Sequence, residues 1–218
     1  MSTYQIVCLA NSWKHKARCV DEKITTGQYA GRWVRPVGNR EDNRAILDAE
    51  RQYQTGGFAV PLDVMEIAFT SRQAGTFQQE NLIISNVKWK LVKRLTIADL
   101  AQYLDTPAQL WENGHDSTYG KNDKIPARFL ADPRQSLSLI QPKNLKVRVS
   151  KEHGEKNKVR VFFDYKDTNY GLTATDSKLV FDYQDKPIGI YDLDKVKYLT
   201  ISLGEKLDNG DSYKLIAH

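Results

Sequence analysis

The second half of the chain constrains the fold most strongly, because its strand and helix signals are closely spaced. Three segments rich in β-branched and aromatic residues precede one short helical segment and two more strand-like segments. In order they read LKVRVS, KVRVFFDY, NYGLTATD, DSKLVFDY, VKYLTISLG and DSYKLIAH. Asp176 or Ser177 is expected to cap the helix, and an Asn209-Gly210 turn to join the last two strands. This β-β-β-α-β-β order is that of an OB-fold, with Src-homology-3-like barrels as the competing interpretation.

The first half is less regular. Its expected strands are Tyr4–Ala10, 17–23, Gly31–Val37, Leu62–Phe69 and Asn81–Val92, and its expected helices are Arg40–Tyr53 and Thr96–Leu104. The segment 112–129 is rich in Gly, Asn and Asp and lacks periodicity, which indicates a long loop with a chance of being a lid or binding element. Pro142 is taken as the boundary. We therefore expect a mainly β (α+β) chain with lobes 1–142, carrying inserted short helices, and 143–218.

Composition excludes several classes of protein. With 40% hydrophobic and 27% charged residues, the chain can build a core, and no stretch approaches the roughly 20 apolar residues of a membrane span. The N-terminus lacks a basic region followed by a long apolar one, so we expect a cytoplasmic protein without a membrane partner. Cys8 and Cys19 are too few for a disulfide framework, and the four histidines are scattered, so no metal site is expected. No cofactor can be assigned.

Positive charge is concentrated in two segments. The net charge is +5. Seven Lys or Arg face two acidic residues in Lys14–Arg40, and the same numbers hold for Lys143–Arg160. From Val161 onward, seven basic residues face ten acidic ones. Two basic segments in a near-neutral remainder favour contacts with phosphates over general solubility.

A set of motifs, taken together, resembles the dual OB-containing domain family, bacterial proteins described as nucleic-acid modification proteins. The motifs are CLANSWKHKARCV, WVRPV, LDVMEI, LWENGHDSTYGKNDKI, SLSLIQPKNL, YGLTATD and YLTISLGE, in the order expected of that family. The resemblance covers nearly the whole chain. It implies two OB-like β-barrels, of which the residues by themselves support only the second, a C-terminal OB-fold at 143–218.

The end of the first strand carries the first candidate contacts. Asn11, Ser12, Lys14 and Arg18 supply an amide, a hydroxyl and two cations, which suit phosphate oxygens. The alternative is that the amide and hydroxyl form a local turn while the cations are solvated. Both interpretations stay open.

Two further groups extend the predicted nucleic-acid contacts. Trp33 and Arg35 fit a base platform and a phosphate contact, or else a core tryptophan and an arginine paired with an acid such as Glu66. For the tryptophan the core is favoured, and for the arginine the phosphate. The basic hairpin of the second half completes the predicted set with Arg148, Lys151, Lys158 and Arg160.

Residues for catalysis are less well defined. His115 lies beside Asp116, and Asp123 lies in the same loop, so a histidine and two acids are close in sequence here. A solvated loop explains His115 equally simply. With Asn11 and Ser12, these residues are the catalytic candidates, and we expect a rim pocket of Asn11, Ser12, Arg35 and part of the loop.

These observations favour binding of nucleic acid, single-stranded in preference, or of a nucleotide. One alternative is an enzyme acting on nucleic acid or nucleotides at the rim pocket around Asn11, Ser12 and Arg35, and whether the chain is an enzyme stays open. The other is an adaptor that binds a protein partner in a bacterial defence or mobile-element system.

Overall fold

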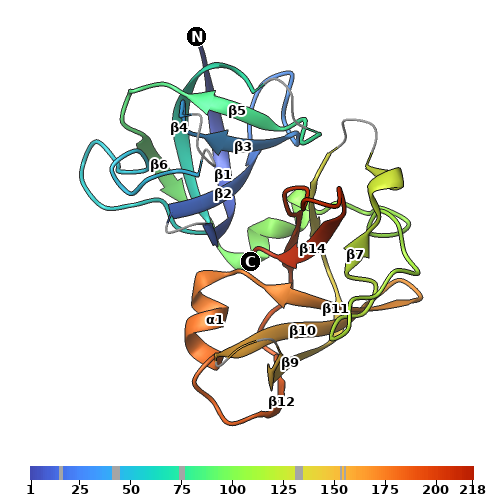
Figure 1. Ribbon diagram of the computed structural model, residues 1–218. Coiled ribbons are helices and arrows are strands. Elements are labelled where there is room, and N and C mark those ends of the chain that lie inside the picture. Colours follow the sequence, from blue (N-terminus) through green and yellow to red (C-terminus); the bar gives the residue numbers. More distant parts are fainter. Residues whose placement is uncertain (15–16, 41–44, 74–76, 131–134, 153, 155) are drawn as a thin grey trace. The chain divides into compact units, whose positions relative to one another are not determined.

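The computed structural model describes the chain except residues 15–16, 41–44, 74–76, 131–134, 153 and 155, and it describes Trp13 and Lys14 by their backbone only. The chain divides into two compact units (Figure 1). Unit 1 comprises 1–103 with 133–136, and unit 2 comprises 104–132 with 137–218.

Unit 1 is a closed five-stranded barrel. Its elements are β1 (Ser2–Lys14), β2 (Ala17–Ile24), β3 (Trp33–Val37), β4 (Asp63–Arg72), β5 (Asn81–Ile84), β6 (Lys90–Arg94) and the 3-10 helix η1 (Ile97–Tyr103). The order is β1-β2-β3-β5-β4, and β4 pairs back with β1. The β3–β5 pair is parallel and the other pairs are antiparallel. Strand β6 pairs antiparallel with residues 63–66 of β4, which β5 does not reach.

Unit 2 repeats this scheme. Its elements are β7 (Lys124–Ile125), the 3-10 helix η2 (Ala127–Phe129), β8 (Leu137–Ile140), β9 (Lys143–Lys151), β10 (Asn157–Tyr165), β11 (Thr168–Ala174), α1 (Ser177–Tyr183), β12 (Gly189–Asp192), β13 (Leu199–Leu203) and β14 (Ser212–Ile216). The order is β12-β9-β10-β11-β14-β13-β8, with β11–β14 parallel. Only Gln141 and Pro142 separate β8, at one end of this order, from β9, the second strand from the other end.

The shared strand scheme confirms the prediction of a mainly β chain with two OB-like barrels. In each unit three antiparallel strands are followed by a parallel pairing of the third strand with a later one, β5 in unit 1 and β14 in unit 2, and this later strand pairs antiparallel with the strand before it. This is the Greek-key arrangement of an OB-fold. The inserted helices of the first half are the short segments η1 and η2.

Alternation along the strands builds one core in each unit. In unit 1 the core includes Ile6, Cys8, Val20, Val34, Met65 and Trp89. In unit 2 it includes Val147, Val149, Val159, Val161, Phe163, Tyr170 and Leu172. The Phe163 and Tyr170 rings are stacked with centroids 5.4 Å apart. Because alternate residues face opposite sides of a strand, the even-numbered residues of β9 and β10 lie outside the unit 2 barrel.

Helix α1 begins where the sequence predicts. The Asp176 side chain accepts a hydrogen bond from Leu179 N at 2.6 Å, so Asp176 is the N-cap. The predicted helix Arg40–Tyr53 is not formed in its described part, 45–53. Ile46 instead exchanges two backbone hydrogen bonds with Arg18 of β2, and a turn follows it. Tertiary pairing overrides local helical propensity here.

The division into units falls before the boundary expected at Pro142. Segment 104–132 belongs to unit 2, because β7 pairs with β14 and Tyr170 accepts a hydrogen bond from Leu110 N. Strand β8 belongs there as well, since it pairs with β13. A separate feature is that none of the described helices is long and apolar enough to cross a membrane.

Gly171 of β11 yields a test of the unit 2 sheet. A Cβ atom there would lie 2.4 Å from Cε1 of Phe162, whereas at Gly189 of β12 it would meet only the Tyr191 ring at 3.8 Å. Gly171→Ala should therefore lower the free energy of unfolding by about 1–3 kcal/mol through overpacking. Gly189→Ala should change it by less than about 0.5 kcal/mol. Urea denaturation followed by circular dichroism measures both, and equal effects would contradict this packing.

Candidate nucleic-acid interface

Among the candidates near the start of the chain, Asn11 and Ser12 lie within strand β1 rather than after its end. Asn11 and Ser12 are buried in β1, with exposed fractions of 8% and 5%, and Asn11 Nδ2 donates to the carbonyl oxygen of Ala59 at 3.0 Å. This bond spans 48 residues, so it is not the local turn. Lys14 ends β1, and its side chain is outside the described part. Arg18 is half-buried in β2.

Arg35 is buried in an ion-pair network instead of standing at an open rim. Its guanidinium lies 2.7 Å from Asp21 Oδ1 and 3.3 Å from Glu80 Oε1, and the residue is 3% exposed. Arg35 therefore pairs with acids, as the alternative to a phosphate contact expected, but its partners are Asp21 and Glu80 and not Glu66. Trp33 is buried too, with Lys23 Nζ 4.8 Å from its ring centroid.

A third acidic residue of this region, Glu22, faces the core of unit 1. Its strand neighbours are Cys8 of β1 and Val34 of β3, both of which are core residues. Among the described residues, neither carboxylate oxygen of Glu22 has a hydrogen-bond partner. Burial, and then the negative charge of Asp21, raises the pKa of Glu22 well above its ordinary value.

This burial makes the stability of unit 1 depend on pH. The folded pKa of Glu22 lies above the unfolded value of about 4.3. The contribution of Glu22 to the free energy of unfolding is therefore fully present below that unfolded value. It is lost as the pH rises through the folded pKa, by up to about 1.4 kcal/mol per pH unit. Glu22→Gln should raise the free energy of unfolding at pH 8 and change it little at pH 4.

Urea denaturation between pH 4 and pH 8 measures this effect. Glu66→Gln is the control, since Glu66 is half-buried and paired with Lys90 at 3.1 Å. A profile that Glu22→Gln leaves unchanged would show that Glu22 is ionised in the folded state.

In unit 2, side chains with the chemistry for nucleic acid gather on the outer side of one sheet. We call this side of β12, β9 and β10 the outer face. Strand register places the following residues on it: Lys146, Arg148, Ser150, Lys158, Arg160, Phe162, Ile190 and Asp192. Lys146 and Lys158 are exposed, and Ile190, paired with Arg148, is 67% exposed.

An aromatic ring and a guanidinium are stacked in the middle of the outer face. The guanidinium carbon of Arg148 lies 4.7 Å from the ring centroid of Phe162. The ring in turn packs against Gly171 of β11, where no Cβ stands in its way. A nucleic-acid base can stack on an aromatic ring or on the plane of an arginine side chain.

Arg160, next to this stack, is held by two carboxylates. Its Nε lies 2.7 Å from Glu152 Oε1, and its Nη1 lies 3.1 Å from Asp123 Oδ2. Arg160 is 6% exposed and Asp123 is 1% exposed. Arg160 therefore lies on the predicted strand, but it neutralises protein carboxylates.

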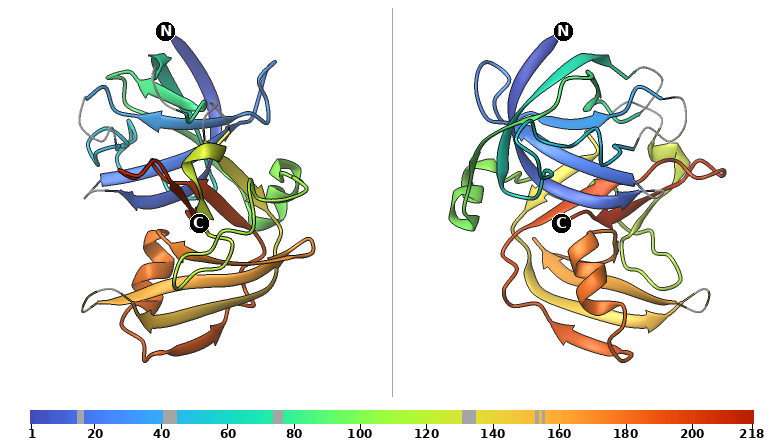
Figure 2. Two further views of the ribbon diagram at one scale, coloured as in Figure 1. Left: turned by 45° about the vertical axis from the view of Figure 1, so that its right-hand side comes forward. Right: turned by 90° about the vertical axis from the view of Figure 1, so that its left-hand side faces the viewer.

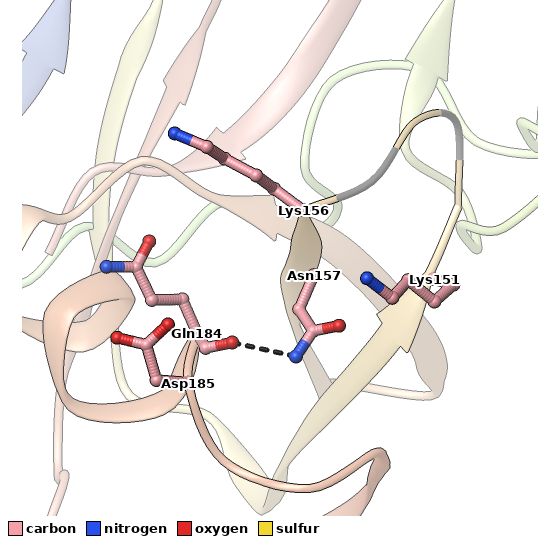
Figure 3. Close-up of a pocket in the computed structure, with 5 residues that line it drawn as sticks. All are labelled: Lys151, Lys156, Asn157, Gln184 and Asp185. Carbon is pink, nitrogen blue, oxygen red and sulfur yellow. Dashed lines mark hydrogen bonds between the residues drawn. The ribbon is translucent and has the colours of Figure 1, made fainter.

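A pocket of about 330 Å³ lies at the end of the β9–β10 hairpin. We call it the hairpin pocket. Its lining residues are Lys151, Lys156, Asn157, Gln184 and Asp185 (Figure 3). Asn157 Nδ2 donates to the carbonyl oxygen of Gln184 at 2.8 Å, which joins the hairpin to the end of α1. Lys151 and Lys156 are exposed, so the pocket presents two cations beside amide groups.

The loop candidates lie in unit 2. The Asp116 carboxylate accepts hydrogen bonds from Lys121 Nζ at 2.9 Å and from Asn122 N at 2.7 Å, and these two bonds lower its pKa. The His115 ring packs on Phe129, with centroids 5.6 Å apart. The geometry therefore brings Asp116 to Lys121 rather than to His115.

A family model for the dual OB-containing domain matches residues 4–218, which is essentially the whole chain. The chain belongs to the dual OB-containing domain family. A search of curated proteins finds no match. Two solved structures show weak likeness to this family member: tetrameric p202 HIN2, at 12% identity, and a murine DNA-binding protein bound with double-stranded DNA, at 7%.

The alignment with p202 HIN2 covers 99% of this chain and 88% of that one, with a TM-score of 0.28. The alignment with the murine protein covers 99% and 94%, with a TM-score of 0.27. Scores this low carry no argument about function. The family assignment therefore rests on the sequence match, and the strand scheme of the two units agrees with it.

Sequence reasoning missed several residues of this dual OB-containing chain. Phe162 was not among the predicted contacts, although its even number places it on the other side of the strand from Val161 and Phe163, and alternation alone could have assigned it to the outer face. Lys156 lay within the basic segment but was not singled out. Gln184 and Asp185 carry no sequence signal, because only the tertiary fold brings the end of α1 to the hairpin.

Proposed function

We propose that this protein binds nucleic acid, single strands in preference, through the outer face and the hairpin pocket of unit 2. The observation that carries the proposal is the stack of Arg148 on Phe162, with the exposed cations Lys146, Lys151 and Lys158 on the same hairpin. OB-folds hold oligonucleotides on their second and third strands and on the loop between strands one and two. In unit 2 these are β10, β11 and the hairpin end.

The preference for single strands follows from the chemistry of the stack. Bases of a duplex are stacked on one another and offer no free face, whereas a single strand can place a base on Phe162 or Arg148. Lysines around the stack suit phosphate oxygens of a flexible backbone. Other dual OB-containing proteins, described as nucleic-acid modification proteins, suggest a role as a modification factor, and the reaction is left open.

Removing the two lysines of the hairpin pocket tests the electrostatic part. Binding of a fluorescent deoxythymidine 20-mer should fall with salt, and Lys151→Ala with Lys156→Ala should make the slope of log K against log salt shallower by about 0.7 for each lost phosphate contact. Lys195→Ala with Lys197→Ala is the matched control, since both lysines are exposed outside the hairpin. Fluorescence anisotropy measures all three proteins.

Two outcomes would count against the proposal. The first is that the natural protein shows no binding at low salt. The second is that the control pair flattens the salt slope as much as the pocket pair does.

The alternative functions have less support. For an enzyme at the rim pocket, Asn11, Ser12 and Arg35 are buried in unit 1, and Asp123 is bonded within unit 2. For an adaptor, the favourable observation is a set of exposed apolar side chains: Phe181 at 78% and Ile188 at 65%. Binding of a protein partner in a defence system would use these residues.

A further inference from the structure

Part of the outer face of unit 2 is covered by a segment of the same unit. We call residues 112–123 the strap (Figure 2, light green). Its last residues are paired with the sheet, since Lys121 and Gly171 of β11 exchange two backbone hydrogen bonds and Lys214 N donates to the carbonyl oxygen of Asp123. Its first residues are held by the buried Lys214, whose Nζ donates to Glu112 O at 2.6 Å and to Asn113 Oδ1 at 3.0 Å.

Between these two anchors, residues 116–120 form what we call the lid turn. Ser117 donates to the Asp123 carboxylate twice, from its N at 2.7 Å and from its Oγ at 2.6 Å. Gly120 N donates to Ser117 Oγ at 3.1 Å. A guanidinium nitrogen of Arg148 donates to the carbonyl oxygen of Tyr119. The lid turn is thus attached to the outer face through Asp123 and Arg148.

Gly120 shows how closely the lid turn packs on Asp123. A Cβ atom at this position would lie 1.9 Å from Asp123 Oδ2. Two polar groups connect the lid turn to the outer face: the Asp123 carboxylate, which accepts from Ser117 and pairs with Arg160, and the Arg148 guanidinium, which donates to Tyr119 O. Such contacts are open to competition, because a phosphate presents the same charge and the same acceptor atoms as a carboxylate.

The closed lid turn occupies groups that the proposed function needs. The Asp123 carboxylate holds Arg160 at 3.1 Å, and the Tyr119 carbonyl oxygen holds the Arg148 guanidinium that stacks on Phe162. A strand bound along β10 would need these same cations. The hairpin pocket, in contrast, is lined by no residue of the strap.

We propose that the lid turn regulates nucleic-acid binding: it covers the Arg148–Phe162 stack in the free protein and opens when a phosphate competes with Asp123 and Tyr119 for Arg160 and Arg148. This inference rests on the proposed function. The hairpin pocket would take the first phosphate, and opening of the lid turn would then add the base-stacking surface. Because only the open state offers the stack, the apparent affinity is the affinity of the open state multiplied by the fraction of protein that is open.

Loosening the lid turn should therefore tighten binding. Asp123→Asn removes the carboxylate that accepts from Ser117. Because losing a charge-assisted contact makes the open state more populated, this variant should bind a deoxythymidine 20-mer about ten-fold more tightly. Asp167→Asn adds the same unit of charge on the exposed β10–β11 turn and is the control. Ser117→Ala changes no charge, loses the hydroxyl that donates to Asp123 and accepts from Gly120 N, and should tighten binding by roughly three-fold.

Hydrogen exchange of the natural protein gives a second readout that needs no variant. The amides of Ser117 and Gly120 are bonded within the lid turn and to Asp123, so they should exchange faster when the oligonucleotide is added. The amides of Lys121 and Gly171 each donate to the other residue's carbonyl oxygen, so their exchange rates should stay the same.

The outcomes separate the two proposals. Tighter binding by Asp123→Asn and by Ser117→Ala, with Asp167→Asn unchanged, supports the lid turn. Binding that is equal in all four proteins, or slower exchange of Ser117 and Gly120 on addition of the oligonucleotide, overturns the lid turn and leaves nucleic-acid binding intact. No binding by any of the four proteins overturns the proposed function and the inference with it.

Discussion

The parallel pairing of the third strand with a later strand is the constraint on which each unit depends. In unit 1 it joins β3 to β5 over three residue pairs, and the barrel closes through β4 and β1. In unit 2 it joins β11 to β14 over only two pairs, Thr173 with Leu215 and Ala174 with Ile216. Beyond these pairs Lys121 bonds to β11 and β7 bonds to β14. The strap and β7 therefore supply backbone partners that the short parallel pair leaves open.

Each barrel also carries a buried arginine between two carboxylates on the outer side of its sheet. In unit 1, Arg35 lies between Asp21 and Glu80. In unit 2, Arg160 lies between Glu152 and Asp123. Removing the arginine of such a group would leave both carboxylates without that partner, which is destabilising, whereas Arg160 keeps Glu152 when Asp123 is neutralised.

The two sites differ in where their acids come from. Asp21 lies on β2, beside β3, so it is part of the barrel itself. Asp123 belongs to the strap, which also carries the lid turn. The same local chemistry thus fixes one barrel and, in the other, connects the sheet to a segment above it.

The sequence predicted those features that depend on short-range pattern. Alternation located β9, β10 and β11, and Asp176 marked the start of α1. It did not predict the closure of unit 1, because β3 and β5 pair across a long intervening segment. It also assigned a helix around Ile46, where backbone bonds to Arg18 decide the structure.

The candidate site was predicted in part, for the same physical reason. The basic hairpin is visible as a run of lysines and arginines, but their partners are not. Burial of Arg35 and Arg160 follows from acids distant in sequence, and the position of the strap follows from bonds to Gly171 and Lys214. Lys151 and Lys158 are exposed, and they remain predicted contacts.

Photo-crosslinking tests the central claim, that unit 2 binds nucleic acid on its outer face, most directly. A single-stranded oligonucleotide carrying 4-thiothymidine is irradiated with the natural protein, and the crosslinked peptides are mapped by mass spectrometry. Our account predicts crosslinks within 146–162 and at the hairpin pocket, and their loss when an excess of unmodified single strand competes. Crosslinks confined to the strands of unit 1, or crosslinks that the competitor does not reduce, would contradict it.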